Sequence, residues 1–204
     1  MIHEMELQPW LERMMEGDTE AFREVYARIH PHVYRTVSFM AGHKDDVSDI
    51  VNEVYIALFQ ALPSYKPEQP FRPWLNGIIA RQTSNWRRRL WRRMRLADRS
   101  RTLSKVEPPH VQPGDGLLKA ESSSELLQHV GRLSMKLRQI VVLRYYQDHT
   151  YEEMADVLDI PVGTVKSRHN AALVKLRRLM EQNDATPAAA ASNIGEGAGH
   201  RVHS

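Results

Sequence analysis

The 204-residue chain contains no cysteine, which excludes disulfide bonds, thiolate metal sites and cysteine nucleophiles. No apolar run approaches the ~20 residues that a membrane-spanning helix needs, and the N-terminus lacks the pattern of a secretory signal. No alternation of apolar and polar residues is long enough to indicate a strand. These absences predict an all-α protein of the cytoplasm.

The sequence also lacks the patterns of catalytic and cofactor sites. Its ten histidines show no metal-ligand spacing, and no nucleophile stands in a pattern that pairs it with a base. The glycines between Gly195 and Gly199 follow no predicted strand, so they do not form a nucleotide-binding loop. We therefore expect no catalytic residue, no metal, no cofactor and no small-molecule substrate.

Positive charge is concentrated in one segment, although the net charge is only +3. Nine arginines and a single acid, Asp98, lie between Arg81 and Arg101. On a helix, one stripe about 30 Å long gathers Arg81, Asn85, Arg88, Arg92, Arg95 and Arg99. Guanidinium groups bind phosphates, so the stripe favours a nucleic-acid backbone as partner, with Arg81, Gln82 and Asn85 placed to read base edges. A solvated or membrane-surface basic helix is the alternative.

Apolar spacing predicts two helical domains and the segments around them. The first, residues 7–96, has helices interrupted at Gly17-Asp18-Thr19 and at Pro31, a loop from Pro63 to Pro73, and a long helix from Phe71 or Trp74 to about Leu96. Proline and glycine mark residues 97–121 as a flexible linker. A capping box of Ser122 and Glu125 is expected to open the second domain, residues 122–181, in which Ser134 caps the next helix and Tyr145 faces inward. Residues 182–204 are expected to be disordered.

An acidic stripe precedes the arginine helix. Asp46, Asp49 and Glu53 are spaced along one helix face, opposite the apolar stripe of Val47, Val51, Val54 and Leu58. Nothing in the sequence supplies a pocket for acid–base chemistry, so a docking surface for a basic partner is favoured. Ordinary solvated charge is the alternative.

Residues 150–180 have the pattern of a helix-turn-helix. Thr150 and Glu153 form a capping box, and Pro161 separates this helix from a second one. Val165, Ala172, Leu176 and Leu179 share one face of the second helix. Its opening turns carry Thr164, Lys166, Ser167 and Arg168, which suits a helix that reads the major groove. A plain αα-hairpin with a solvated basic face remains open at this point.

Three of these motifs, in this order, resemble the bacterial sigma-70 factors, specifically the extracytoplasmic-function group. Residues 46–59 resemble region 2.2, which implies that Asp49, Asn52 and Glu53, with neighbouring Asp46, bind the clamp helices of the β′ subunit of core RNA polymerase. Residues 71–89 resemble regions 2.3 and 2.4, which melt and read the −10 element. Residues 151–168 resemble region 4.2, which reads the −35 element. The resemblance also implies promoter DNA and an anti-sigma factor as partners.

Three residues of the second predicted helix depart from the family pattern. His169 stands where the family has an apolar residue, and Ala171 and Leu173 stand where arginines are common, which implies a weaker grip on phosphates at −35.

A free-standing helix-turn-helix regulator would need a dimer interface or effector pocket, which the two charged stripes do not explain. A recombinase or nuclease would need a nucleophile or a metal cluster, and none is visible.

Overall fold

The computed structural model describes residues 4–41, 44–100 and 121–184, and all regular structure in these ranges is helical. The all-α prediction is confirmed for this part of the chain. The N-terminal unit holds α1 (Glu4–Met15), α2 (Thr19–Ala41), α3 (Val47–Ala61), the short 3₁₀ helix η1 (Leu62–Ser64) and α4 (Phe71–Ser100). The C-terminal unit holds α5 (Glu121–Gly131), α6 (Met135–Val141), the π-helical turn η2 (Val142–Tyr146), α7 (Tyr151–Leu158) and α8 (Val162–Asp184).

The predicted break between the first two helices lies at Gly17 and Asp18. Gly17 has a φ of +88°, a left-handed conformation that ends α1 without the strain a side chain would add. The Asp18 carboxylate accepts hydrogen bonds from the backbone N–H groups of Glu20 and Ala21 at 2.8 and 3.2 Å, so it caps α2. These hydrogen bonds lower the pKa of the Asp18 carboxyl, and the one from the Ala21 N–H has the largest effect.

The second predicted break, at Pro31, is wrong, because α2 continues through this residue. A proline within a helix removes one backbone hydrogen bond and crowds the preceding turn. Here the buried residues Ile29, Val33 and Val37 continue one apolar face across Pro31, which is itself exposed. Packing of that face on both sides of the proline outweighs the lost bond.

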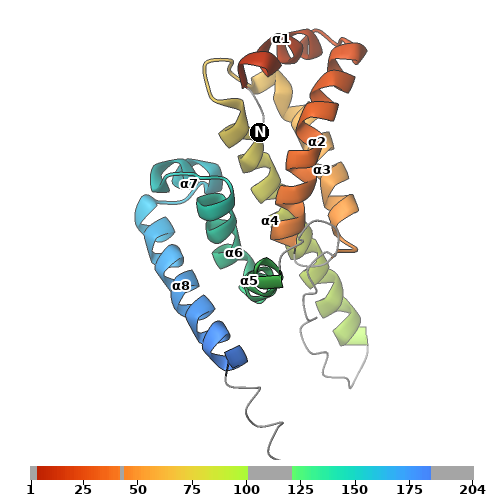
Figure 1. The fold of residues 1–204 in the computed structure, drawn as a ribbon. Helices are drawn as coiled ribbons and strands as arrows, with labels where there is room; N and C mark the ends of the chain where they lie inside the picture. The colour runs from red at the N-terminus through yellow and green to blue at the C-terminus, as the bar shows by residue number, and fades with distance from the viewer. Residues whose placement is uncertain (1–3, 42–43, 101–120, 185–204) are drawn as a thin grey trace, which may run out of the picture.

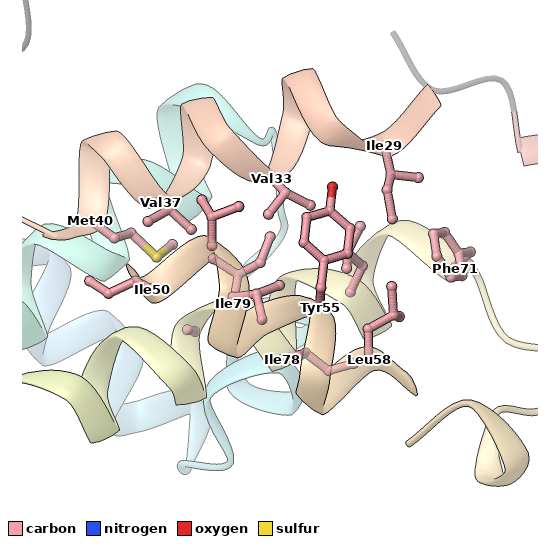
Figure 2. Packing of buried hydrophobic residues seen from close by; sticks show 14 of the residues in the cluster. Ile29, Val33, Val37, Met40, Ile50, Tyr55, Leu58, Phe71, Ile78 and Ile79 are labelled. Carbon is pink, nitrogen blue, oxygen red and sulfur yellow. The ribbon is translucent and has the colours of Figure 1, made fainter. Parts of the chain in front are cut away.

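The core of the N-terminal unit is formed by the facing sides of α2, α3 and α4 (Figure 2). Ile29, Val33, Val37 and Met40 come from α2, Ile50, Tyr55 and Leu58 from α3, and Phe71, Ile78 and Ile79 from α4. The long α4 is therefore held in place by its first half. Its second half, after Thr83, carries the arginines beyond this core.

The C-terminal unit differs from the prediction at two positions. Helix α5 already begins at Glu121, so Ser122 lies inside it rather than at its cap. Tyr145 is 59% exposed rather than inward-facing, because the backbone widens into the π-helical turn η2 there. Ser134 is the N-cap of α6 as predicted, although its side chain makes no capping hydrogen bond. A small core joins α5, α6 and α8: Val130, Leu133, Val141, Ala172 and Leu176.

The two units pack against each other, with α7 beside α4 and α6 near α2 (Figure 1). A single apolar cluster continues from the N-terminal unit into Ile140, Leu143, Met154 and Val165 of the C-terminal unit. Most of the predicted linker and tail lies outside the described residues, although α4 extends to Ser100 and α8 to Asp184. Within the described ranges, no helix has the length and apolar content needed to cross a membrane.

Candidate DNA-binding and docking surfaces

The helix-turn-helix is built by α7, a left-handed turn and α8. Thr150 Oγ1 accepts a hydrogen bond from the Glu153 backbone N–H at 3.2 Å, and Glu153 Oε2 accepts one from the Thr150 N–H at 2.7 Å. The capping box is thus confirmed. The bond from the Thr150 backbone is the main reason that the pKa of Glu153 is lowered. Asp159, at a φ of 52°, turns the chain after α7, and the Pro161 carbonyl accepts from Thr164 and Val165 as α8 begins.

The residues predicted to contact DNA lie on the outer side of α8. Lys166 and Ser167 are exposed, and Thr164 and Arg168 are half-buried. Val165 is fully buried and anchors the opposite face. The Lys166 ammonium lies 5.7 Å from the centre of the Tyr151 ring, a cation–π contact that holds it near the start of the helix. The opening turns of α8 therefore present polar groups outward from a fixed base.

His169 is held by two tyrosines and has a structural role. Its Nε2 lies 3.0 Å from the Tyr145 hydroxyl and its Nδ1 3.2 Å from the Tyr151 hydroxyl. Burial is the main cause of its lowered pKa. These contacts tie α8 to η2 and α7. Ala171 and Leu173, the other two departures from the family pattern, are exposed on α8.

The arginine stripe on α4 is solvent-exposed over most of its length. Arg81, Arg88, Arg92 and Arg95 are exposed, whereas Gln82 and Asn85 are half-buried. Arg88 Nη2 donates a hydrogen bond to Asn85 Oδ1 at 2.5 Å, which links the phosphate-binding and base-reading candidates. The Arg99 side chain lies outside the described residues. A polyanion could therefore follow the stripe along the free half of α4.

The acidic stripe on α3 is adjacent to the arginine helix. Asp49 and Asn52 are exposed, while Asp46 is half-buried at the N-cap of α3. Glu53 Oε1 lies 3.1 Å from Arg89 Nη2, an ion pair without a well-directed hydrogen bond. Both side chains are more than one-third exposed, so solvent screens this pair. Glu53 is thus partly engaged within the chain, which leaves Asp49 and Asn52 as the freely presented members.

Sequence reasoning missed an apolar extension of the same face. Ile56 follows Asn52 by one turn of α3 and is 55% exposed, and Phe59 is 44% exposed. Phe59 packs on Phe22 of α2, with ring centres 4.7 Å apart. The i, i+4 spacing from Asn52 to Ile56 was the available signal. The acidic stripe therefore borders a partly apolar surface.

The predicted sites form three separate surfaces rather than one pocket. The stripe on α3, the arginines of α4 and the outer face of α8 come from different elements, and each presents side chains to solvent. Among the described residues, no three histidine, aspartate or glutamate side chains converge as a metal site would require. This arrangement suits contacts with extended macromolecules.

Comparison with known proteins matches two segments of the chain, which include α3, α4 and α8. Residues 25–93 match the family described as Sigma-70 region 2, and residues 130–178 match Sigma-70, region 4. The chain is 32% identical over 168 residues to the ECF RNA polymerase sigma-E factor of Escherichia coli K12, covering 78% of this chain and 85% of that protein. It is 25% identical over 181 residues to the ECF RNA polymerase sigma factor SigW of Bacillus subtilis, covering 86% of this chain and 97% of that one.

Two solved structures share the fold. One is CnrH in complex with the cytosolic domain of CnrY, with 23% identity, a TM-score of 0.58 and coverage of 86% of this chain and 97% of that one. The other is the sigma factor RpoE of Bartonella quintana in complex with the anti-sigma factor NepR, with 19% identity, a TM-score of 0.62 and coverage of 80% and 98%. With both regions present and 32% identity to a sigma-E factor over most of its length, the chain belongs to the sigma-70 family, in the extracytoplasmic-function group.

Proposed function

We propose that the chain binds core RNA polymerase through α3 and directs it to promoters through α4 and α8, without catalysing a reaction itself. The main observation in support of this proposal is that three exposed polar surfaces lie on the elements that match regions 2 and 4 of the family. A free-standing regulator would have no use for region 2, which accounts for residues 25–93. Since its partners act on the chromosome, the proposal places the protein in the cytoplasm.

On promoter DNA, the two helical surfaces have different tasks in this proposal. The exposed Arg88, Arg92 and Arg95 hold phosphates of the −10 region, while Arg81, Gln82 and Asn85 read its bases. Thr164, Lys166, Ser167 and Arg168 read the −35 element in the major groove, because the opening turns of a recognition helix reach base edges.

The polymerase-binding surface is proposed to consist of Asp46, Asp49, Asn52 and Glu53, extended by the exposed Ile56. Its partner is the β′ clamp helices, whose basic surface would complement the carboxylates. The half-exposed Glu53–Arg89 pair opens readily, so Glu53 remains available to the partner. The proposal also includes inhibition by an anti-sigma factor. RpoE, which shares this fold, was solved in complex with such a factor, NepR.

Charge reversal at Asp49 tests the proposal. Asp49→Arg places a cation on an exposed site, so its folding free energy should change by no more than about 0.5 kcal/mol. Its binding to core RNA polymerase, measured by pull-down and titration, should fall at least tenfold, because like charges now face each other (~1.4 kcal/mol per tenfold). Asp45→Arg, exposed in the turn before α3, is the matched control and should bind normally. Normal binding by folded Asp49→Arg would reject this surface.

A further inference from the structure

Tyr145 is an exposed aromatic side chain on the C-terminal unit. Its exposure of 59% is the highest of any phenylalanine, tyrosine or tryptophan among the residues that the structure describes. It belongs to the π-helical turn η2, where the Gln147 N–H donates to the Val142 carbonyl, five residues earlier, at 3.1 Å. Single π-helical turns are frequent at functional sites. The position of Tyr145 therefore indicates a role other than core packing.

The ring of Tyr145 lies against His169 of α8. The two rings are stacked, with centres 5.7 Å apart and planes inclined by 29°. The Tyr145 hydroxyl lies 3.0 Å from His169 Nε2, and the Tyr151 hydroxyl lies 3.2 Å from His169 Nδ1. The imidazole of the recognition helix thus links a tyrosine of η2 to a tyrosine at the start of α7. We call these three side chains the relay.

The relay cannot use both hydroxyl protons. Burial is the main cause that lowers the pKa of His169, and the positive charge of Arg144 lowers it further, so the imidazole is neutral at neutral pH. A neutral imidazole has one N–H and one accepting nitrogen, so it donates to one tyrosine and accepts from the other. The tyrosine that accepts from the imidazole keeps its own O–H for a further acceptor.

An anion beside Tyr145 would select one of the two tautomers of His169. Phosphate oxygens accept hydrogen bonds, so the hydroxyl that meets them must be free to donate. With the His169 proton on Nε2, the imidazole donates to Tyr145 and accepts from Tyr151 at Nδ1. All the hydrogen bonds then run in one direction, from Tyr151 towards the anion, and bonds in such a chain strengthen one another. Tyr145 ends the chain because it is exposed, whereas Tyr151 is half-buried.

The surroundings of the relay are positively charged. The Arg144 guanidinium and the Lys166 ammonium lie 5.4 and 5.7 Å from the centre of the Tyr151 ring. Among the residues that the structure describes, Arg144 is also the one charged group that shifts the pKa of His169. A positive potential favours an anionic ligand at this surface.

The relay borders the face of α8 that is proposed to read the −35 element. At about 100° per residue, His169 lies about 60° round the helix from the exposed Lys166, towards the buried Val165. When a recognition helix lies in the major groove, groups beside its reading face approach the phosphates that line the groove. Leu173, one turn after His169, is exposed but uncharged. Tyr145 is therefore placed to supply a hydrogen-bond donor on this flank.

We propose that Tyr145 binds a phosphate of −35 DNA through its hydroxyl group, and that His169 is the positioning residue that orients this hydroxyl. The inference rests on the proposed function, because −35 DNA is its ligand, and it adds a contact outside the opening turns of α8. It gives His169, which replaces an apolar residue of the family pattern, a task in DNA binding as well as in the fold. A phenol adds a hydrogen bond without neutralising a phosphate, so its effect is distinct from that of a cation.

Removal of one hydroxyl group tests the contact. The probe is a promoter duplex selected from a random library by holoenzyme that contains the unchanged chain. Tyr145→Phe keeps the ring that stacks on His169. Its holoenzyme should bind the duplex about tenfold more weakly, because a charge-assisted hydrogen bond is lost. The slope of log affinity against log salt should not change. Equal affinities of the two holoenzymes would overturn the proposal.

A matched change in the DNA distinguishes a phosphate contact from a structural effect. In a set of duplexes, one phosphate at a time is replaced by an uncharged methylphosphonate. At one position beside the −35 major groove, the difference between unchanged and Tyr145→Phe holoenzyme should disappear, because the partner of the hydroxyl has been removed. If Tyr145→Phe were weaker by the same factor on every duplex, the hydroxyl would be structural and the proposal would be rejected.

Two variants of His169 test its positioning role. Glutamine can place its amide nitrogen near the position of Nε2 and donate to Tyr145, so His169→Gln should bind within about twofold of the unchanged chain. His169→Leu fills the half-buried site without a donor and should bind about tenfold more weakly. Added to Tyr145→Phe, it should cause no further loss, because both changes remove one contact. Additive losses, or equal binding by the two His169 variants, would reject the positioning role.

The neighbouring tyrosine of η2 is the matched control. Tyr146 packs edge-to-face on Phe39 of α2, with ring centres 4.6 Å apart, and Tyr146→Phe should leave the affinity for the duplex unchanged. A loss equal to that of Tyr145→Phe would overturn the assignment of the contact to Tyr145. If holoenzyme with the unchanged chain selects no duplex, the proposed function fails and this inference fails with it. If it selects one that Tyr145→Phe binds equally well, only this inference is overturned.

Discussion

Thr150 contributes to stability through a single local interaction. Its hydroxyl accepts from the Glu153 backbone N–H at the start of α7. Thr150→Ala should lower the free energy of unfolding by about 1 kcal/mol, measured by urea denaturation, because one N–H of the first turn loses its partner. Thr150→Ser keeps the hydroxyl and should change stability by only a few tenths (~0.3 kcal/mol). Equal midpoints for the alanine and serine variants would show that the cap contributes nothing.

Asn85 is the residue at which base reading and helix structure can be distinguished. In the free chain its Oδ1 accepts from Arg88, so the amide is already oriented on the helix surface. Asn85→Ala should change the preferred −10 sequence in a transcribed promoter library while leaving the dependence of binding on salt intact, because no phosphate contact is lost. Identical base preferences would assign Asn85 a structural role on the helix.

At the residue scale, two predictions from local signals are confirmed, whereas the equally local capping box at Ser122 is not. The capping box at Thr150 and the break at Gly17 each depend on residues within a turn, and both were predicted from the sequence. Asn76 and His149 are 73 positions apart and were not identified. No spacing rule links an amide on one helix to an imidazole in a distant loop, so their pairing could be found only in the structure.

At the scale of the element, the arginines of α4 should act as a group. Arg92 and Arg95 are exposed and lie beyond the core-packed half of the helix. Replacing both with alanine should weaken binding of the polymerase holoenzyme to all promoters alike, and should reduce the slope of log affinity against log salt by at most about two units.

The control for the arginine group is a basic residue on another helix. Arg177 is exposed near the end of α8, outside the proposed recognition turns. Arg177→Ala should leave unchanged the slope of log affinity against log salt for binding of the holoenzyme to promoters. A change in sequence preference with Arg92→Ala and Arg95→Ala, rather than a uniform loss, would mean that these arginines read bases.

Helix limits were harder to predict than helix existence. The apolar stripes of α2, α3 and α4 were visible in the sequence, and all three helices exist. Pro31 was expected to end a helix by its local geometry, but the buried face on either side of it continues. Tyr145 was misplaced because a helical period cannot anticipate the π-helical turn. At Pro31, packing of the continuous buried face outweighed a local rule.

At the scale of the whole molecule, the sequence predicted two units but not their association. A proline- and glycine-rich segment between them indicated independence, and the buried side chains that hydrogen-bond across their contact include Asn76, Gln139, Gln147 and His149. Such residues are ordinarily assigned to the surface, since burial without partners is costly. Their partners lie on the other unit, so only the assembled chain shows why they are buried.

The packed contact between the two units should respond to pH, because His32 of α2 and His149 of the C-terminal unit bond to Asn76 of α4 there. Burial is the main cause that lowers the pKa values of His32 and His149 from the usual 6.5. The nearby Arg72 lowers both further, whereas Glu153 and Asp148 act in the opposite direction on His149. The closed form therefore binds fewer protons than an open form with solvated imidazoles. Closure is favoured above pH 6.5 and is progressively lost as the pH falls below it.

Spin labels on Ala27→Cys in α2 and Lys175→Cys in α8, both exposed, would measure this dependence by double electron–electron resonance, since the sequence has no other cysteine. Acidification from about pH 8 to about pH 5.5 should increase the long-distance population, because a protonated His149 would point its Nε2–H at Asn76 Nδ2, which can only donate. His32→Gln with His149→Gln removes both titrating groups but keeps polar side chains, and should flatten the response. His169→Gln is the control, since this histidine bonds only tyrosines of its own unit, and should leave the response intact. A response that survived in the His32→Gln, His149→Gln chain would place the titrating group elsewhere than at Asn76.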